Sequence, residues 1–201
     1  MAPLVLSKKL ILLASLLFPV AAFAFDEVPR KDQIALMAEA KKTDMTGVAR
    51  KTKLVDARPA SLGEIVITFI KGQGVETRSK PAEDGDWVVR NRCEETGNEE
   101  ILVKARNFPT RYGEPLTEPD AAGYRTFEPK GSNMRYFIVT DEIGPFNFRA
   151  PWGETMIALP GDAIVQVEDD ESDTYRVAAE AFQCTYEIID PAKMVVDVSL
   201  R

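Results

Sequence analysis

Two stretches of the chain share one order of turn and strand residues, and this internal similarity constrains the fold most. Residues 74–112 and 153–186 each contain a Gly-Asp pair, two short apolar runs around an acidic turn, and a closing Phe-x-x-x-Tyr. The intervals from the Gly of the pair to the closing Tyr are 27 and 25 residues. The copies therefore differ by two residues, in a turn where insertions are well tolerated. The pattern predicts a unit repeated in tandem.

The residues of the Gly-Asp turns favour a turn for physical reasons. In Pro160-Gly161-Asp162, proline presets φ, glycine permits a positive φ, and the aspartate side chain can accept backbone N–H bonds. The first copy has Gly85-Asp86 at the same place. The apolar runs that follow each turn predict a β-hairpin, which is marginally stable on its own. We therefore expect the two copies to complete one core.

Short runs of β-branched and aromatic residues make up most of the remaining pattern. They are bounded by Gly, Pro, Asn or Asp, and no long helical pattern separates them, which predicts antiparallel strands rather than βαβ units. The Phe and Tyr that close each copy are four residues apart and share one face of a helical turn. The predicted fold is mostly β (α+β), with antiparallel hairpins from a duplicated strand–turn–strand–helical-turn unit. The runs are residues 64–70, 87–91, 100–103, 134–140, 146–149, 162–167, 174–177 and 194–200.

The N-terminal part of the chain has a different pattern. Residues 31–42 carry an apolar stripe with an acidic residue early and lysines late, which predicts one helix. Residues 46–63 have no clear period and are expected to form an extended linker. The predicted organisation is an N-terminal helix and linker over residues 25–60 and a β-rich domain over residues 61–201.

The repeated unit resembles the PGDYG family of small β-rich modules, named for its Pro-Gly-Asp-Tyr-Gly turn. Pro160, Gly161 and Asp162 match that turn in the second copy, and Gly85-Asp86 followed by an aromatic, Trp87, match it in the first. Neither copy has the final Tyr-Gly, and the likeness covers about 35 residues of each. The resemblance implies a fold and no catalytic residues.

The first 24 residues have the layout of a secretory signal peptide. Lys8 and Lys9 precede an apolar run, and Ala22-Phe23-Ala24 places small residues where a signal peptidase cleaves. The alternative is an uncleaved anchor, but the apolar run is shorter than the ~20 residues that span a bilayer. We expect residues 1–24 to be removed, and the protein to lie in the periplasm or outside the cell.

The numbers of cysteines and histidines limit the kinds of catalytic and metal sites that the protein can contain. Cys93 and Cys184 are the two cysteines, and an even pair in an oxidising compartment predicts a disulfide; two buried free thiols are the alternative. The sequence has no histidine. Ser–His–Asp and Cys–His catalysis, and histidine-based zinc or haem sites, are therefore excluded.

Charge argues against nucleic acid as a partner. The signal holds two lysines and no acidic residue, so residues 25–201 carry 23 basic and 32 acidic side chains, a net charge of −9. Such a chain repels phosphate backbones. No second apolar segment approaches the length of a membrane span.

Five carboxylates crowd into residues 168–173. Asp169, Glu171, Asp173 and Glu180 match positions 1, 3, 5 and 12 of an EF-hand loop, but Thr174 stands where that loop needs glycine. We interpret the run as a hairpin tip, because turns collect such residues for backbone reasons. No metal site and no cofactor are predicted, since nucleotide-binding fingerprints are also absent from the sequence.

Aromatic and acidic residues near residues 141–154 supply the remaining candidates. Trp87 and Trp152 are the candidate ligand-facing aromatics, and Phe146 with Phe148 could form a platform, although burial in a core is the commoner role. Paired carboxylates can hydrolyse glycosidic bonds without histidine. Candidates for that chemistry are Asp141, Glu142 and Glu154.

The sequence favours an exported binding or structural accessory protein without catalysis, whose ligand it does not identify. The missing histidine and the lack of a catalytic motif support this expectation. A carboxylate-dependent hydrolase of cell-envelope glycan is the alternative. A third hypothesis is a subunit of an envelope complex that docks through residues 31–42. The partner would be an envelope protein or a glycan.

Overall fold

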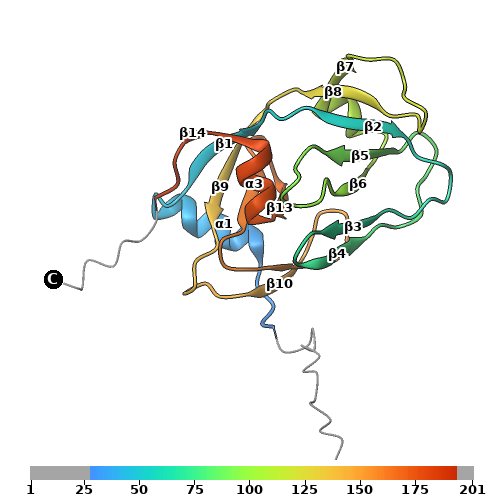
Figure 1. Cartoon of the computed structure of the whole chain (residues 1–201). Coiled ribbons are helices and arrows are strands. Elements are labelled where there is room, and N and C mark those ends of the chain that lie inside the picture. The colour runs from blue at the N-terminus through green and yellow to red at the C-terminus, as the bar shows by residue number, and fades with distance from the viewer. Residues whose placement is uncertain (1–27, 194–201) are drawn as a thin grey trace, which may run out of the picture.

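The computed structural model describes residues 28–193, which form two five-stranded sheets, two two-stranded hairpins and three helices (Figure 1). All strand pairs within the sheets and hairpins are antiparallel. The prediction of a mostly β fold is therefore confirmed. The predicted signal peptide and the predicted last strand, residues 194–200, lie outside the described residues.

The first sheet has the strand order β6-β5-β2-β8-β7. Its core side is lined by Val55, Val89 and Phe127, which pack with Phe108 from the short helix α2 (Phe108–Arg111). Alternation along the strands puts these apolar side chains on one face, as expected for a half-buried sheet. The strands are β2 (Val55–Pro59), β5 (Trp87–Asn91), β6 (Glu100–Val103), β7 (Tyr112–Pro115) and β8 (Arg125–Pro129).

The second sheet has the order β13-β12-β9-β1-β14 and is covered on both faces. Helix α3 (Ala179–Thr185) packs Phe182 against Tyr136 on one face. Helix α1 (Gln33–Lys42) packs Met37 against Phe137 on the other. The strands are β1 (Gly47–Lys51), β9 (Asn133–Ile138), β12 (Ala163–Val167), β13 (Asp170–Val177) and β14 (Tyr186–Asp190).

A two-stranded hairpin accompanies each sheet. Hairpin β3–β4 joins Ile67–Ile70 to Gly74–Arg78, and hairpin β10–β11 joins Phe146–Arg149 to Thr155–Ala158. The second hairpin adds Phe146, Phe148 and Met156 to the core beneath α1. The first hairpin lies against β6, where the Thr68 hydroxyl donates to the Glu100 carbonyl at 2.8 Å.

The two sheets share one arrangement of strands. When the two strand orders are aligned, β6, β5, β2 and β7 correspond to β13, β12, β9 and β14. In each sheet a short helix precedes the edge strand: α2 precedes β7, and α3 precedes β14. The fourth strand of each order differs in origin. Strand β8 follows β7 directly, whereas the corresponding β1 comes from before the first sheet. The N-terminal strand therefore closes the second sheet.

The predicted N-terminal helix is present as α1. Asp32 caps it, because its Oδ1 accepts the amides of Ile34 and Ala35 at 2.9 and 3.2 Å. Lys41 and Lys42 lie in its last turn, where the helix dipole favours cations. The buried Gln33 side chain donates to the Arg149 carbonyl at 3.0 Å and so joins the helix to β10.

The segment expected to be a linker contains two strands instead. Strands β1 and β2 fall within residues 46–63 and lie in the interior of the two sheets. Their inward positions are held by Gly47 and Ala49 in β1 and by Val55 and Ala57 in β2. Small residues give a weak hydrophobic period, which explains why the alternation is hard to detect in the sequence.

Gly47 is expected to tolerate no side chain. A Cβ there would lie 2.4 Å from the Asp190 carbonyl oxygen and 2.4 Å from the Ala192 amide nitrogen, both backbone atoms that cannot rotate away. Gly47→Ala should therefore destabilise the protein by about 1–3 kcal/mol, measured by urea denaturation. Gly113→Ala, where the nearest atom lies 3.7 Å from the added Cβ, is the control. Equal stability of the two variants would contradict this packing.

Candidate functional site

The aspartates of the two Gly-Asp turns are buried and bonded in the same way. Asp86 and Asp162 are each 1% exposed. Asp86 accepts the amides of Glu83 at 2.8 Å and Ala105 at 3.0 Å. Asp162 accepts those of Leu159 at 2.7 Å and Ala179 at 3.1 Å. Gly85 and Gly161, which precede them, have φ of 80° and 95°. These residues therefore fix the turns.

A cation pairs with each of these aspartates. Lys104 donates to Asp86 at 2.8 Å. Burial acts to raise the pKa of Asp86. The hydrogen bonds from Lys104 and from backbone amides outweigh this effect and hold the pKa below its ordinary value. In the second turn, the Arg176 Nε donates to Asp162 at 2.7 Å. The side chain of Arg176 is only 4% exposed, whereas that of Lys104 is 34% exposed.

Arg176 also joins the second sheet to hairpin β3–β4. Its guanidinium pairs with Glu76, and it donates to the Gln73 side chain at 2.8 Å. Glu76 lies on β4, and Gln73 lies in the turn before that strand. Burial raises the pKa of Glu76 above its ordinary value, although Arg176 acts against this. One buried arginine therefore sets the position of β4 relative to β12 and β13.

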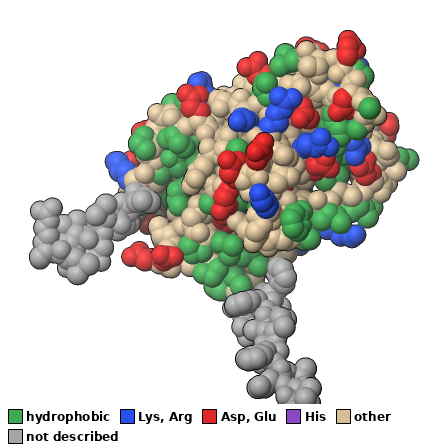
Figure 2. All heavy atoms as spheres, viewed as in Figure 1, with side chains coloured by type: hydrophobic (Ala, Val, Ile, Leu, Met, Phe, Trp, Pro, Cys, Tyr) green, Lys and Arg blue, Asp and Glu red, His purple; other side chains and the backbone are tan. Residues whose placement is uncertain are grey.

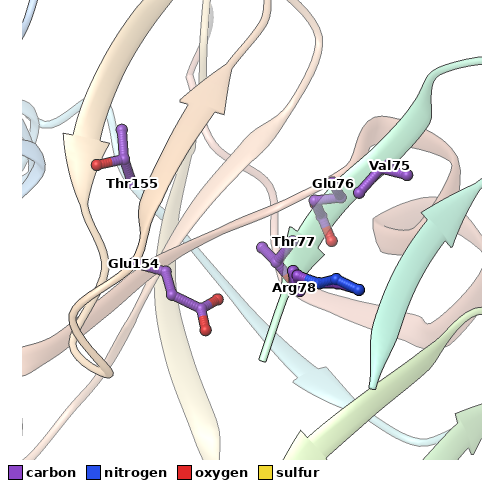
Figure 3. Close-up of a pocket in the computed structure, with 6 residues that line it drawn as sticks. All are labelled: Val75, Glu76, Thr77, Arg78, Glu154 and Thr155. Carbon is purple, nitrogen blue, oxygen red and sulfur yellow. The ribbon is translucent and has the colours of Figure 1, made fainter. Parts of the chain in front are cut away.

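A cleft of about 470 Å³ lies between the two hairpins (Figure 3). Strand β4 forms one wall of the cleft (Figure 3). The other wall is formed by Thr155, which begins β11, and by Glu154, which precedes it. Five of the six lining residues are polar and supply two carboxylates, one guanidinium and two hydroxyls, but most of the surface that they present to the cleft is apolar. The residues are Val75, Glu76, Thr77, Arg78, Glu154 and Thr155.

Trp152 lies beside this cleft and Trp87 does not. The indole Nε1 of Trp152 donates to Glu154 at 3.1 Å, and the side chain is 41% exposed. Its ring packs on Tyr175 with centroids 5.8 Å apart. Trp87 instead stacks on Phe108 at 4.0 Å within the core of the first sheet. Of the two candidate aromatics, Trp152 is thus the one with an open face near a polar cleft.

The other candidate residues from this region are separated from the cleft. Asp141 and Glu142 lie in the turn between β9 and β10, while Glu154 lies beyond the other end of β10. Glu142 lines a second hollow of about 230 Å³ beside α1. Phe146 and Phe148 are fully buried and belong to the core. The structure therefore retains only Glu154 from the predicted carboxylates as a cleft residue.

The acidic run at residues 168–173 is the tip and first part of the β12–β13 hairpin, where Val167 pairs with Asp170. Three of its carboxylates face cations from other elements: Glu168 faces Arg135 at 3.8 Å, Glu171 faces Lys41 at 3.2 Å, and Asp173 faces Arg111 at 2.9 Å. The interpretation of this run as a hairpin tip agrees with the strand pairing.

Cys93 and Cys184 lie close together, although 91 residues separate them. Cys93 follows β5 and is buried, whereas Cys184 lies on α3 and is partly exposed. The structure holds both as free thiols, and both donate to Glu95 Oε2, at 3.3 and 3.4 Å. The pKa of the Cys184 thiol is raised to about 12. Burial is the largest cause, and hydrogen bonds to Cys93 and Glu95 add to it. A thiol with so high a pKa is a poor nucleophile at neutral pH.

Hairpin β3–β4 exposes an apolar face next to the cleft. Ile65, Ile67 and Phe69 alternate along one side of the chain and are 45%, 47% and 55% exposed. Val75 pairs with Phe69 across the hairpin and is 61% exposed. Figure 2 shows hydrophobic side chains reaching the surface among interspersed acidic and basic ones. Val75 also lines the cleft, so the apolar face and the cleft are continuous.

Comparisons of the chain with protein-family models, with curated proteins and with solved structures found no match. Within residues 28–193, no helix is both long and apolar enough to cross a membrane.

Several residues of the cleft were not identified from the sequence. Glu76, Thr77 and Arg78 lie in the first copy and Thr155 in the second, so no local motif unites them. The one available signal was the Thr that each copy places after its first glycine, Thr77 and Thr155. Both of these threonines line the cleft.

Proposed function

We propose that this protein is an exported, non-catalytic binding protein that takes a cell-envelope glycan in the cleft between hairpins β3–β4 and β10–β11. One observation carries the proposal: the half-exposed Trp152 is fixed by a hydrogen bond to Glu154, which lines a cleft of hydroxyls and charged groups. An aromatic face beside fixed polar groups suits a ligand with both apolar and polar sides.

The lining matches the chemistry of a sugar. Sugar hydroxyls donate to carboxylates such as Glu154 and accept from a guanidinium such as Arg78, and Thr77 and Thr155 can do either. The C–H face of a pyranose ring packs on an indole. A purely apolar ligand would remove water from the charged groups of the cleft and offer them no hydrogen bonds in exchange, which is costly. A polyphosphate would meet a net charge of −9 over residues 25–201.

A carboxylate-dependent hydrolase is the second candidate, because Glu76 and Glu154 line the same cleft from opposite hairpins. Burial raises the pKa of Glu76, as is common for a general acid. However, Glu76 is paired with the buried Arg176, which favours its ionised form. We therefore favour binding without turnover.

Titration calorimetry of the purified protein with soluble peptidoglycan fragments tests the binding function. Trp152→Ala and Glu154→Gln are each expected to lower the affinity by about 10–100-fold, since each removes a contact of about 1.5–3 kcal/mol. Glu142→Gln is the matched control, because it removes a carboxylate from the other end of β10. Unchanged affinity in both cleft variants would refute the proposed site.

The same fragments separate the two candidate functions. Released reducing ends that increase with time, and that disappear in Glu154→Gln or Glu76→Gln, would assign a hydrolase. Binding without product formation is the result that we expect.

A further inference from the structure

We propose that Cys93, Glu95 and Cys184 form a binding site for one thiophilic divalent cation of the zinc class when both cysteines are reduced. The proposal concerns the thiol state in which the structure holds these residues. It does not depend on the cleft or on its ligand. Within residues 28–193, these three side chains are the one group of potential metal ligands that lies close enough together, with their ligand atoms all within 4.8 Å of one another.

The distances fit tetrahedral coordination. Zn–S bonds of about 2.3 Å and Zn–O bonds of about 2.0–2.2 Å give a sulfur-to-oxygen edge of about 3.5 Å in a tetrahedral site. The two thiol sulfurs lie 3.3 and 3.4 Å from Glu95 Oε2. A cation could therefore replace the two thiol protons while both sulfur-to-oxygen distances stay nearly unchanged. A disulfide alone would need no carboxylate at this position.

Two different parts of the chain hold the ligands in place. Cys93 and Glu95 lie in the turn between β5 and β6, and the Thr96 hydroxyl donates to the Cys93 carbonyl at 3.0 Å, which fixes that turn. Cys184 is held by α3, and its thiol faces the Arg92 carbonyl at 3.8 Å. Because Cys184 is partly exposed and Glu95 is exposed, a cation can reach the site from solvent.

The donor set indicates the class of metal. Two thiolates favour zinc, cadmium and similar thiophilic ions over calcium or magnesium, which prefer oxygen ligands. Three protein ligands leave a fourth position for water or an exogenous ligand. Metal binding would release the thiol protons, so the affinity should rise with pH.

Cobalt(II) titration of the reduced protein under anaerobic conditions tests the site. We expect a thiolate-to-cobalt charge-transfer band that saturates at one equivalent and is displaced by Zn²⁺. Cys184→Ser should abolish the band, and Glu95→Gln should weaken binding at least about tenfold, since loss of even an outer-shell partner costs about 10–100-fold. Glu94→Gln, which alters the neighbouring carboxylate, is the control and should bind as the wild type does.

Two results would overturn the proposal. One is a reduced protein with two titratable thiols that develops no charge-transfer band. The other is a Glu95→Gln variant that binds cobalt as tightly as the Glu94→Gln control, which would show that the carboxylate is not a ligand. Circular dichroism of each variant confirms that the fold is retained.

Discussion

Arg176→Met is expected to lower the free energy of unfolding by roughly 3–5 kcal/mol, because removing one partner of a buried ion pair leaves the others uncompensated. Arg176 is almost fully buried between two acidic residues, Asp162 and Glu76, whose side chains are 2% and 14% exposed. Without the guanidinium, both carboxylates would have to be protonated or exposed to water. Guanidinium chloride denaturation followed by circular dichroism measures the change.

Lys104→Met is the matched control for Arg176→Met. Lys104 pairs with Asp86 in the first copy, as Arg176 pairs with Asp162 in the second, but its side chain is 34% exposed and water can replace it. We expect a loss of about 1 kcal/mol there. Equal effects of the two variants would show that burial of the arginine does not determine the stability of this turn.

Formation of a Cys93–Cys184 disulfide is expected to stabilise the protein by roughly 4–5 kcal/mol. In the chain-entropy model, this is the effect of closing a loop of 91 residues. The structure places the two cysteines side by side, on α3 and in the turn that follows β5, so the bond would join the two sheets. Unfolding curves of the exported protein with and without reductant measure the difference.

The Cys93→Ser/Cys184→Ser double variant is the control for the disulfide, since reductant should leave its unfolding curve unchanged. Non-reducing peptide mapping of the exported protein should find the two cysteines in one linked pair of peptides. If both cysteines of the exported protein are free, the disulfide prediction is wrong. The metal site would then describe the resting state of this pair.

Some strands with large side chains could be predicted from the sequence, whereas others, such as β14 with Ile188 and Ile189, were missed. Strands β5, β6 and β10 have the predicted boundaries, because Trp, Val, Ile and Phe give them a clear period. Strands β1 and β2 were missed because small residues hold three of their four inward positions, Gly47 and Ala49 in β1 and Ala57 in β2. The central places of β1 and β2 in their sheets depend on pairing with strands far away in the chain, and a local sequence pattern carries no information about such pairing.

We propose that the two sheets are copies of one duplicated unit. The common strand order supports this, as do the equivalent hydrogen bonds of Asp86 and Asp162. The closing aromatic pairs are also alike, with ring centroids 5.1 Å apart for Phe108 and Tyr112 and 5.0 Å apart for Phe182 and Tyr186. The hypothesis explains why β1 is needed: it supplies the strand that β8 supplies to the first copy.

The candidate site was harder to predict than the fold. Trp152 and Glu154 could be named from the sequence, but Glu76 and Arg78 meet them only because β4 is held near β11. That placement depends on Arg176, whose three partners come from two parts of the chain, hairpin β3–β4 and the turn before β12. The presence of two cysteines in a chain expected to be exported predicted the Cys93–Cys184 proximity, whereas nothing in the sequence marked Glu95 among its acidic neighbours.

The two tryptophans provide a direct test of the central claim, that the cleft beside Trp152 binds glycan. Their indole N–H signals can be followed by ¹⁵N NMR while soluble peptidoglycan fragments are added, and Trp87, stacked in the core, serves as an internal control. We expect the Trp152 signal to shift in a saturable way and the Trp87 signal to stay in place. A Trp152 signal that does not move at saturating ligand would contradict the proposed function.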